Sequence, residues 1–148
     1  MKDQNKIIII IVIIGIIITL SLLYLIPQDF VKPELHQDEL SGAIIYATGE
    51  FQSGDHPTSG TAQILEVNNT FVLRFENFKT DDGPGLYVYL SRDTEATDFI
   101  SLGELKAIEG NMNYNINTEI ELNEYKNVLV WCEPFSVLFG YAQLDFII

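Results

Sequence analysis

The chain contains a single cysteine, Cys132, which lies between the only tryptophan, Trp131, and the carboxylate of Glu133. As a thiolate, a cysteine can be oxidised, exchange with disulfides or ligate a metal. A nearby cation or helix N-terminus favours the thiolate, whereas Glu133 opposes it. The alternative is a small apolar side chain that faces the core from a strand together with Val128 and Val130. The residue types alone leave both interpretations open.

His56 is the second residue with candidate chemistry, and it lies in a loop that runs from Gly54 to Gly60. Its imidazole can ligate a metal or haem iron, or act as a base that raises the thiolate fraction of Cys132. The alternative is a loop histidine that hydrogen-bonds the backbone. Pro134 cannot donate to a sheet, so the strand that carries Cys132 is expected to break, bulge or turn there. The sulfur would then lie near a strand end, where a ligand can reach it.

Other cofactor chemistry has less support in the sequence. A blue-copper centre needs two His, a Cys and a weak axial Met, and the residues available for it are His36, His56, Cys132 and Met112. No His or Met follows the cysteine at the usual short spacing, which disfavours copper. The haem-attachment motif C-x-x-C-H is absent, so haem ligation by Cys132 or His56 has no specific motif behind it. No serine lies in a nucleophile elbow, and a conventional enzyme is not expected.

The charge and hydropathy of the chain indicate which segments surround these candidate residues. The formal net charge is −13 with eight scattered basic residues, which excludes a basic patch for nucleic acid. Residues 7–26 carry no charge and are long enough to cross a bilayer as a helix. This run exceeds a signal-peptide core, and no small-residue cleavage site follows it. An uncleaved, single-pass transmembrane anchor is therefore expected.

The domain organisation follows from this anchor. Lys2 and Lys6 precede the apolar run and acidic residues follow it, so residues 1–6 are expected in the cytoplasm and the rest outside the cell membrane. Residues 27–43 are polar, contain Pro33 and are interpreted as a stalk. Residues 44–148 are then the extracytoplasmic domain. One cysteine forms no disulfide within the chain, so a hydrophobic core must stabilise this domain.

Short alternating runs separated by turn residues fill the chain from Ile44 onward and predict an all-β fold, a single β-sandwich or small barrel. Ala62 and Ile64 are expected to share one face. Asn68 and Asn69 predict a hairpin turn, and "TDDGPG" predicts another turn. Asn68 also begins an N-x-T glycosylation sequon, whose use depends on the host. The aromatic residues expected to fill the core are Phe51, Phe71, Phe75, Phe78, Tyr87, Tyr89, Trp131, Phe135 and Phe139.

Five segments in order resemble the electron-transfer DM-thirteen domain family: "GEF", "DHPTSGTAQI", "FVLRFENFKTDDGPGLYVYLS", "LGELKAIEGNMNYNI" and "VLVWCEPFSVLFGYAQL". The resemblance covers about residues 46 to 146. It implies an extracellular all-β domain with a characteristic cysteine and a proposed role in redox reactions, through a free thiol or a bound haem. Cys132 matches the family cysteine, and His56 matches the histidine of its H-x-x-S-G segment.

Two hypotheses of function follow. The first is a membrane-anchored extracytoplasmic redox or electron-transfer domain that acts with an unidentified redox partner. In it, Cys132 is the reactive group or cofactor anchor, and His56 is the supporting ligand or base. The second is a non-catalytic adhesion or ligand-binding module in which Cys132 is core packing and the surface meets an unidentified ligand.

Overall fold

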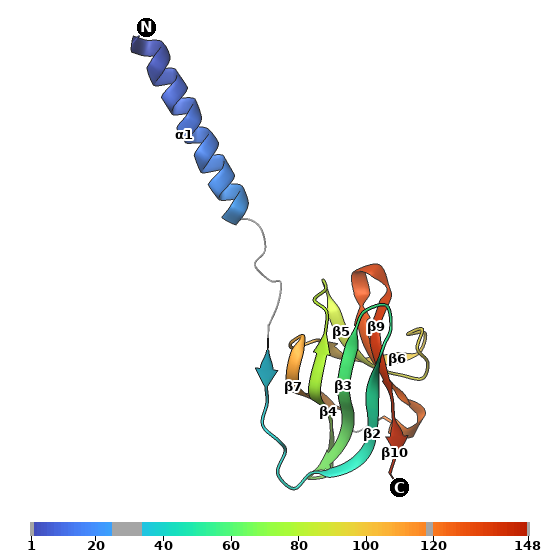
Figure 1. Cartoon of the computed structure of the whole chain (residues 1–148). Helices are drawn as coiled ribbons and strands as arrows, with labels where there is room; N and C mark the ends of the chain where they lie inside the picture. The colour runs from blue at the N-terminus through green and yellow to red at the C-terminus, as the bar shows by residue number, and fades with distance from the viewer. Residues whose placement is uncertain (1, 25–33, 118–119, 148) are drawn as a thin grey trace. The chain divides into compact units, whose positions relative to one another are not determined.

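The computed structural model describes residues 2–24, 34–117 and 120–147. The chain divides into two compact units, Met1–Phe30 and Val31–Ile148. Helix α1 (Lys2–Tyr24) forms the first unit (Figure 1). Its described isoleucines are exposed. No helix among the described residues combines the length and the apolar character that a bilayer crossing requires. The anchor at residues 7–26, of which 25 and 26 lie outside the described residues, therefore stays a prediction.

The second unit is built almost entirely from strands in its described part. The strands are β1 (Leu35–His36), β2 (Ile44–Ser53), β3 (Thr58–Val67), β4 (Thr70–Thr80), β5 (Leu86–Ser91), β6 (Phe99–Glu104), β7 (Glu109–Ile116), β8 (Asn127–Cys132), β9 (Val137–Gln143) and β10 (Asp145–Phe146). Two 3₁₀ turns, η1 (Leu122–Glu124) and η2 (Glu133–Phe135), flank β8. The prediction of a β domain is confirmed for these residues.

The strands join in one curled sheet with the order β1-β7-β4-β3-β2-β9-β8-β5-β6, and β10 pairs with β2. The pairs are antiparallel apart from β1 and β7, which are parallel. Strand β2 links the two halves, because Ile44–Glu50 pair with β3 and Phe51–Ser53 pair with β9. The half with β2, β3, β4 and β7 faces the half with β5, β8 and β9 across the core (Figure 1). The domain is thus a curled half-barrel.

Local signals placed several of these elements correctly. Asn68 and Asn69 adopt φ angles of 49° and 61°, the left-handed conformation that a two-residue hairpin turn requires. Ala62 and Ile64 on β3 are both fully buried and share one face. Strand β8 ends at Cys132, and Pro134 lies in η2 directly after it. The predicted strand break at Pro134 is therefore confirmed.

Aromatic rings from both halves fill much of the core. Phe51 lies edge-on to Phe75 and Phe78, with ring centroids 4.8 and 5.0 Å apart, an arrangement that adds about 0.5–1.5 kcal/mol per pair to the burial term. Tyr87 and Trp131, also expected in the core, are only half-buried and lie outside the core cluster. The expectation for Phe135 is wrong, since this side chain is 69% exposed. It belongs to η2, beyond the end of β8, where the alternation of a strand no longer directs side chains inward.

Residues 34–43, called the strap below, depart from the predicted stalk. Leu35 and His36 form β1 beside Gly110 and Asn111 of β7. The guanidinium Nη1 of Arg74, a residue with a side chain only 3% exposed, donates to the carbonyl oxygens of Gln37 and Asp38 at 3.2 and 3.0 Å. The strap therefore packs on the sheet, and a buried charge holds it there.

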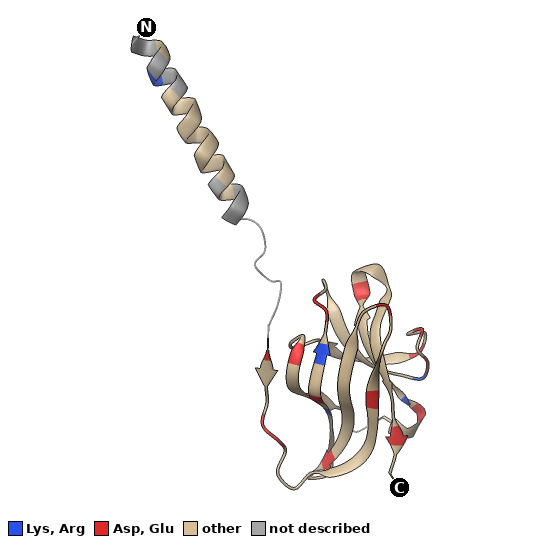
Figure 2. Ribbon diagram, in the orientation of Figure 1, with Lys and Arg blue, Asp and Glu red and all other residues tan. Residues whose placement is uncertain are grey.

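The acidic residues lie on loops and on several strands over much of the second unit (Figure 2). The cations Lys79 and Arg92 each contact a carboxylate, at 2.9 Å from Glu109 and 3.4 Å from Asp98 respectively. Both pairs are well exposed, so each contributes little to stability.

Candidate functional site

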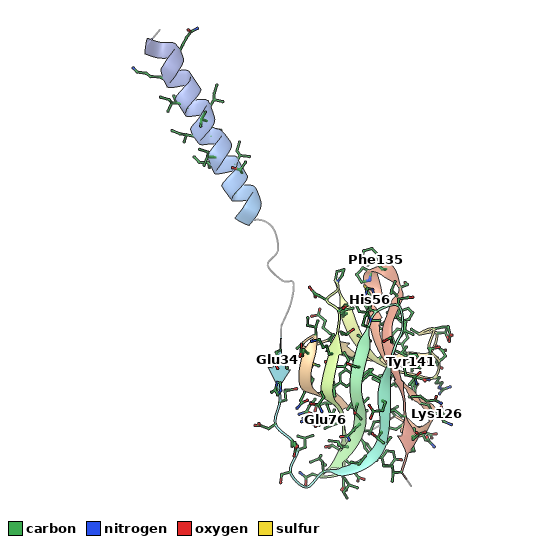
Figure 3. All side chains as sticks on the ribbon, viewed as in Figure 1. Glu34, His56, Glu76, Lys126, Phe135 and Tyr141 are labelled. Atoms are coloured by element: carbon green, nitrogen blue, oxygen red, sulfur yellow. The ribbon has the colours of Figure 1, made fainter. Side chains whose placement is uncertain are left out.

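Three loops meet at one end of the curled sheet. They follow β2, β4 and β8 and consist of residues 54–57, residues 81–85 and η2 with Ser136. Backbone hydrogen bonds join them to each other and to β9: Gly54 N–H donates to Phe139 O at 2.9 Å, and Glu133 N–H donates to Gly85 O at 3.1 Å. His56 and Phe135 lie at this end, and Lys126 lies at the opposite one (Figure 3).

Cys132 is the last residue of β8, and its side chain faces the core with those of Val128 and Val130. Only 2% of the residue is exposed. Its thiol donates to the carbonyl oxygen of Pro84, with Sγ and O 3.1 Å apart. The predicted position at a strand end is therefore right, but the loop of residues 81–85 covers the sulfur and a ligand cannot reach it directly.

Two glycines allow the loop of residues 81–85 to pack closely against this end of the sheet. A Cβ at Gly83 would come 2.6 Å from Cζ of Phe139. Gly85 has a φ of +60°, and a Cβ there would come 2.9 Å from Cδ of Pro134. Neither position accepts a side chain without displacement of its neighbours.

His56 is held by a carboxylate and an aromatic ring. Its Nδ1 lies 3.1 Å from Oδ2 of Asp81, and its ring stacks on Phe139 with centroids 3.8 Å apart and an interplanar angle of 22°. Because Nδ1–H donates to the carboxylate, Nε2 is the acceptor in the neutral imidazole. The side chain is 37% exposed. A carboxylate, and not the backbone considered above, is thus the described partner of this imidazole.

The loop of residues 81–85 touches both predicted site residues. Asp81 bonds His56, Gly83 packs on Phe139 beneath the imidazole, and Pro84 accepts from Cys132. Within residues 34–117 and 120–147, no hydrogen bond or ring contact joins His56 directly to Cys132. The fold therefore brings the two residues to the same end and connects them through this loop.

Sequence reasoning missed the polar residues that support the loops. The hydroxyl of Thr58, which is buried, lies 3.0 Å from that of Thr80 and 3.1 Å from the carbonyl oxygen of Phe139. It also lies 3.2 Å from the carbonyl oxygen of His56. Asp81 was interpreted only as a turn residue. Its partner lies 25 positions away, and no local pattern in the sequence signals such a contact.

Glu133, the neighbour of Cys132, also forms a hydrogen bond through its side chain. Its carboxylate Oε1 accepts from the hydroxyl of Tyr89 on β5. Tyr89 is 1% exposed, and its ring stacks on Phe99 with centroids 4.0 Å apart. Burial, and secondly the hydrogen bond to Glu133, raises the pKa of Tyr89 well above its usual range.

The closed conformation does not present the Cys132 sulfur to a metal or a haem. No group of three or more His, Cys, Asp or Glu side chains in the described residues is arranged to hold a metal ion. A haem iron would need the lone pairs of the Cys132 sulfur, yet this atom is buried and lies beneath Pro84. Haem ligation by Cys132 therefore does not fit this conformation.

The family model described as Electron transfer DM13 matches residues 50–144. The chain belongs to this family. The DM13 match includes all three loops, with His56, Asp81 and Cys132, and it agrees with the family resemblance of the sequence motifs. Searches of curated proteins and of solved structures give no match.

Proposed function

We propose that the DM13 domain of this chain transfers electrons, that Cys132 is its redox group and that His56 is the base serving it. The family match supports the general role. The observation that carries the residue assignment is the loop of residues 81–85, which bonds the Cys132 thiol through Pro84 and the His56 imidazole through Asp81. One movement of this loop would therefore free both groups together.

The chemistry that this arrangement favours is thiol–disulfide exchange with an extracytoplasmic partner. The thiol proton of Cys132 passes to Nε2 of His56, and the sulfur forms a bond to one sulfur of a partner disulfide. The second partner sulfur leaves as a thiolate. In the closed loop, the buried thiol donates to the carbonyl oxygen of Pro84, which is not a base, so exchange requires the loop to open.

We also propose that α1 holds the domain at the outer face of the cell membrane. The sequence supports this, because residues 7–26 are uncharged and Lys2 and Lys6 precede them. Fractionation of cells that express the full chain tests the proposal. Alkaline washing should leave the chain in the membrane, and protease added to intact spheroplasts should degrade the β domain.

The redox assignment is tested with the full chain purified in detergent. The reduced protein is incubated with glutathione disulfide, and the mixed disulfide is measured by mass spectrometry. Cys132→Ser should form none, and His56→Gln should slow its formation by about tenfold or more. His36→Gln is the matched control, because His36 is the other histidine and lies on β1. A wild-type thiol that stays unmodified even after the loop is loosened by substitution refutes the assignment.

One observation favours the second hypothesis, a non-catalytic binding module. Phe135 exposes 69% of its surface at the same end as His56 (Figure 3), and exposed aromatic side chains often anchor protein ligands. Binding to purified envelope fractions distinguishes the hypotheses. A binding module predicts that Cys132→Ala binds as well as wild type and that Phe135→Ser binds less.

A further inference from the structure

Tyr89 and Glu133 form a pair on the side of β5 that faces away from the main core. Val88 and Leu90, the neighbours of Tyr89 on β5, belong to the core cluster, whereas Tyr89 does not. Tyr89 is nevertheless 1% exposed, and its hydroxyl donates to Oε1 of Glu133. We propose that Tyr89 is a one-electron redox site of this domain, with Glu133 as its proton acceptor. This inference rests on the proposed electron-transfer role and adds a second redox group to it.

Tyr89 is assigned this role because a base can accept its hydroxyl proton. One-electron oxidation of a phenol makes the hydroxyl strongly acidic, so the proton must leave, and a base within hydrogen-bonding distance lowers the barrier. The Cys132 thiol donates to a carbonyl oxygen, which is not a base. The hydroxyl of buried Tyr114 lies 3.6 Å from the sulfur of Met112, a poor proton acceptor. Tyr89, in contrast, donates to a carboxylate from a buried position. Tyr87 also donates to a carboxylate, that of Glu104, but at 3.3 Å and from a half-buried position at the surface.

The step balances as follows. Tyr89 loses one electron to an external one-electron oxidant, such as an oxidised metal centre on a partner. The phenolic O–H bond breaks, and the proton forms a new O–H bond at Oε1 of Glu133. The products are a neutral Tyr89 radical, a neutral Glu133 carboxylic acid and the oxidant reduced by one electron. An electron from a donor reverses each change. Since burial raises the pKa of Tyr89, the phenol keeps its proton until this event.

The Tyr89 ring and the Glu133 backbone are held in place, whereas the Glu133 side chain is exposed and is bound through Tyr89. The Glu133 N–H donates to Gly85 O at 3.1 Å, and the next residue, Pro134, packs against Gly85. The Tyr89 ring stacks on Phe99 at an interplanar angle of 19°. The ring of Tyr89 and the backbone of Glu133 therefore keep their positions when the proton moves, which favours fast transfer.

Phe99 provides the contact with a partner. It is 41% exposed and lies at the start of β6, the edge strand of this half of the sheet. A partner that touches Phe99 is separated from Tyr89 by a single ring. The net charge of −13 favours a cationic partner by long-range attraction.

The test uses the full chain in detergent and photogenerated tris(bipyridine)ruthenium(III), a cationic one-electron oxidant. Transient absorbance gives the rate of tyrosyl radical formation, and electron paramagnetic resonance of frozen samples gives the yield. Tyr89→Phe should remove most of the radical. Glu133→Gln, which keeps an acceptor oxygen but is a far weaker base, should slow its formation by about tenfold or more.

Two tyrosines serve as matched controls. Tyr87 lies on the same strand, with its hydroxyl 3.3 Å from Glu104 at the surface, and Tyr114 is buried without a basic acceptor. Tyr87→Phe and Tyr114→Phe should leave the main radical in place. A wild-type yield in Tyr89→Phe, or a wild-type rate in Glu133→Gln, overturns the inference. If Tyr89→Phe does not fold, the rate in Glu133→Gln decides alone.

The same samples separate this inference from the proposed function. Glutathione exchange reports on Cys132, and the radical reports on Tyr89. Loss of exchange with a persistent Tyr89 radical would remove the thiol role and leave the tyrosine site. Normal exchange without a Tyr89 radical would remove the tyrosine site alone.

Discussion

Substitution of Gly83 by alanine should expose Cys132 without unfolding the domain. The new Cβ would lie 2.6 Å from Cζ and 3.0 Å from Cε2 of Phe139, and 3.4 Å from Cδ2 of Leu86. The first two distances are too short, and Phe139 is buried and stacked on His56, so it has little room to move. The strain is relieved when the loop of residues 81–85 lifts away from β9.

The magnitude follows from the cost of overpacking, which is about 1–3 kcal/mol. This cost raises the free energy of the closed loop relative to the open one. The fraction of molecules with an open loop should therefore rise by about 5- to 150-fold, since about 1.4 kcal/mol corresponds to a factor of ten. The rate at which a thiol reagent labels Cys132 should rise by the same factor.

The assay measures the labelling of Cys132 by a chromogenic disulfide under native conditions, together with the urea midpoint. Ile64→Val is the matched control. Ile64 is fully buried on β3, and the substitution costs about 0.5–1.5 kcal/mol without straining the loop. It should lower the midpoint and leave the labelling rate unchanged. If both variants speed the labelling of Cys132 in proportion to their loss of stability, Cys132 reacts only after global unfolding, and the loop argument fails.

Three further outcomes are expected. Arg74→Met removes the buried charge that binds the strap and should cost about 2–4 kcal/mol, with faster cleavage of residues 34–43 by a glutamate-specific protease as the readout. Burial raises the pKa of Tyr114 from 10.0 to about 12. The folded state therefore keeps a proton that the unfolded chain loses. The unfolding free energy that this proton contributes is fully present below about pH 10 and falls by about 2–3 kcal/mol as the pH rises towards 12. Urea unfolding at about pH 10 and about pH 12 should show a smaller loss of unfolding free energy in Tyr114→Phe. Phe135→Ser should change the unfolding free energy by less than about 0.5 kcal/mol, because the side chain is exposed; a larger loss in the same urea assay would show that the ring is buried in solution.

Local features of the chain were sufficient for several parts of the fold. Strand β8 carries Val128, Val130 and Cys132 on one face and ends at Cys132, near the expected break. The turn at Asn68 and the break at Pro134 were also predicted correctly. Each depends on a property of one or two residues: alternation along a strand, tolerance of a positive φ, or the missing N–H of proline.

The candidate site was predictable only in part. The sequence proposed Cys132 and His56 as site residues, placed the cysteine near a strand end, and indicated the DM13 family. It did not show that residues 81–85 cover the sulfur or that Asp81 binds the imidazole. These contacts join residues 48 and 25 positions apart, and the register of distant strands decides them.

Properties of chain neighbours could be predicted from the sequence alone, whereas contacts between distant residues required the tertiary structure. Composition and alternation predicted a β domain and left open whether its cysteine faces inward, because those properties act only between chain neighbours. Only the folded chain shows that the strap pairs with β7 and that Glu133 binds Tyr89, 44 positions away. Alternation states that a side chain points in or out, but the pairing of strands decides which groups it meets there.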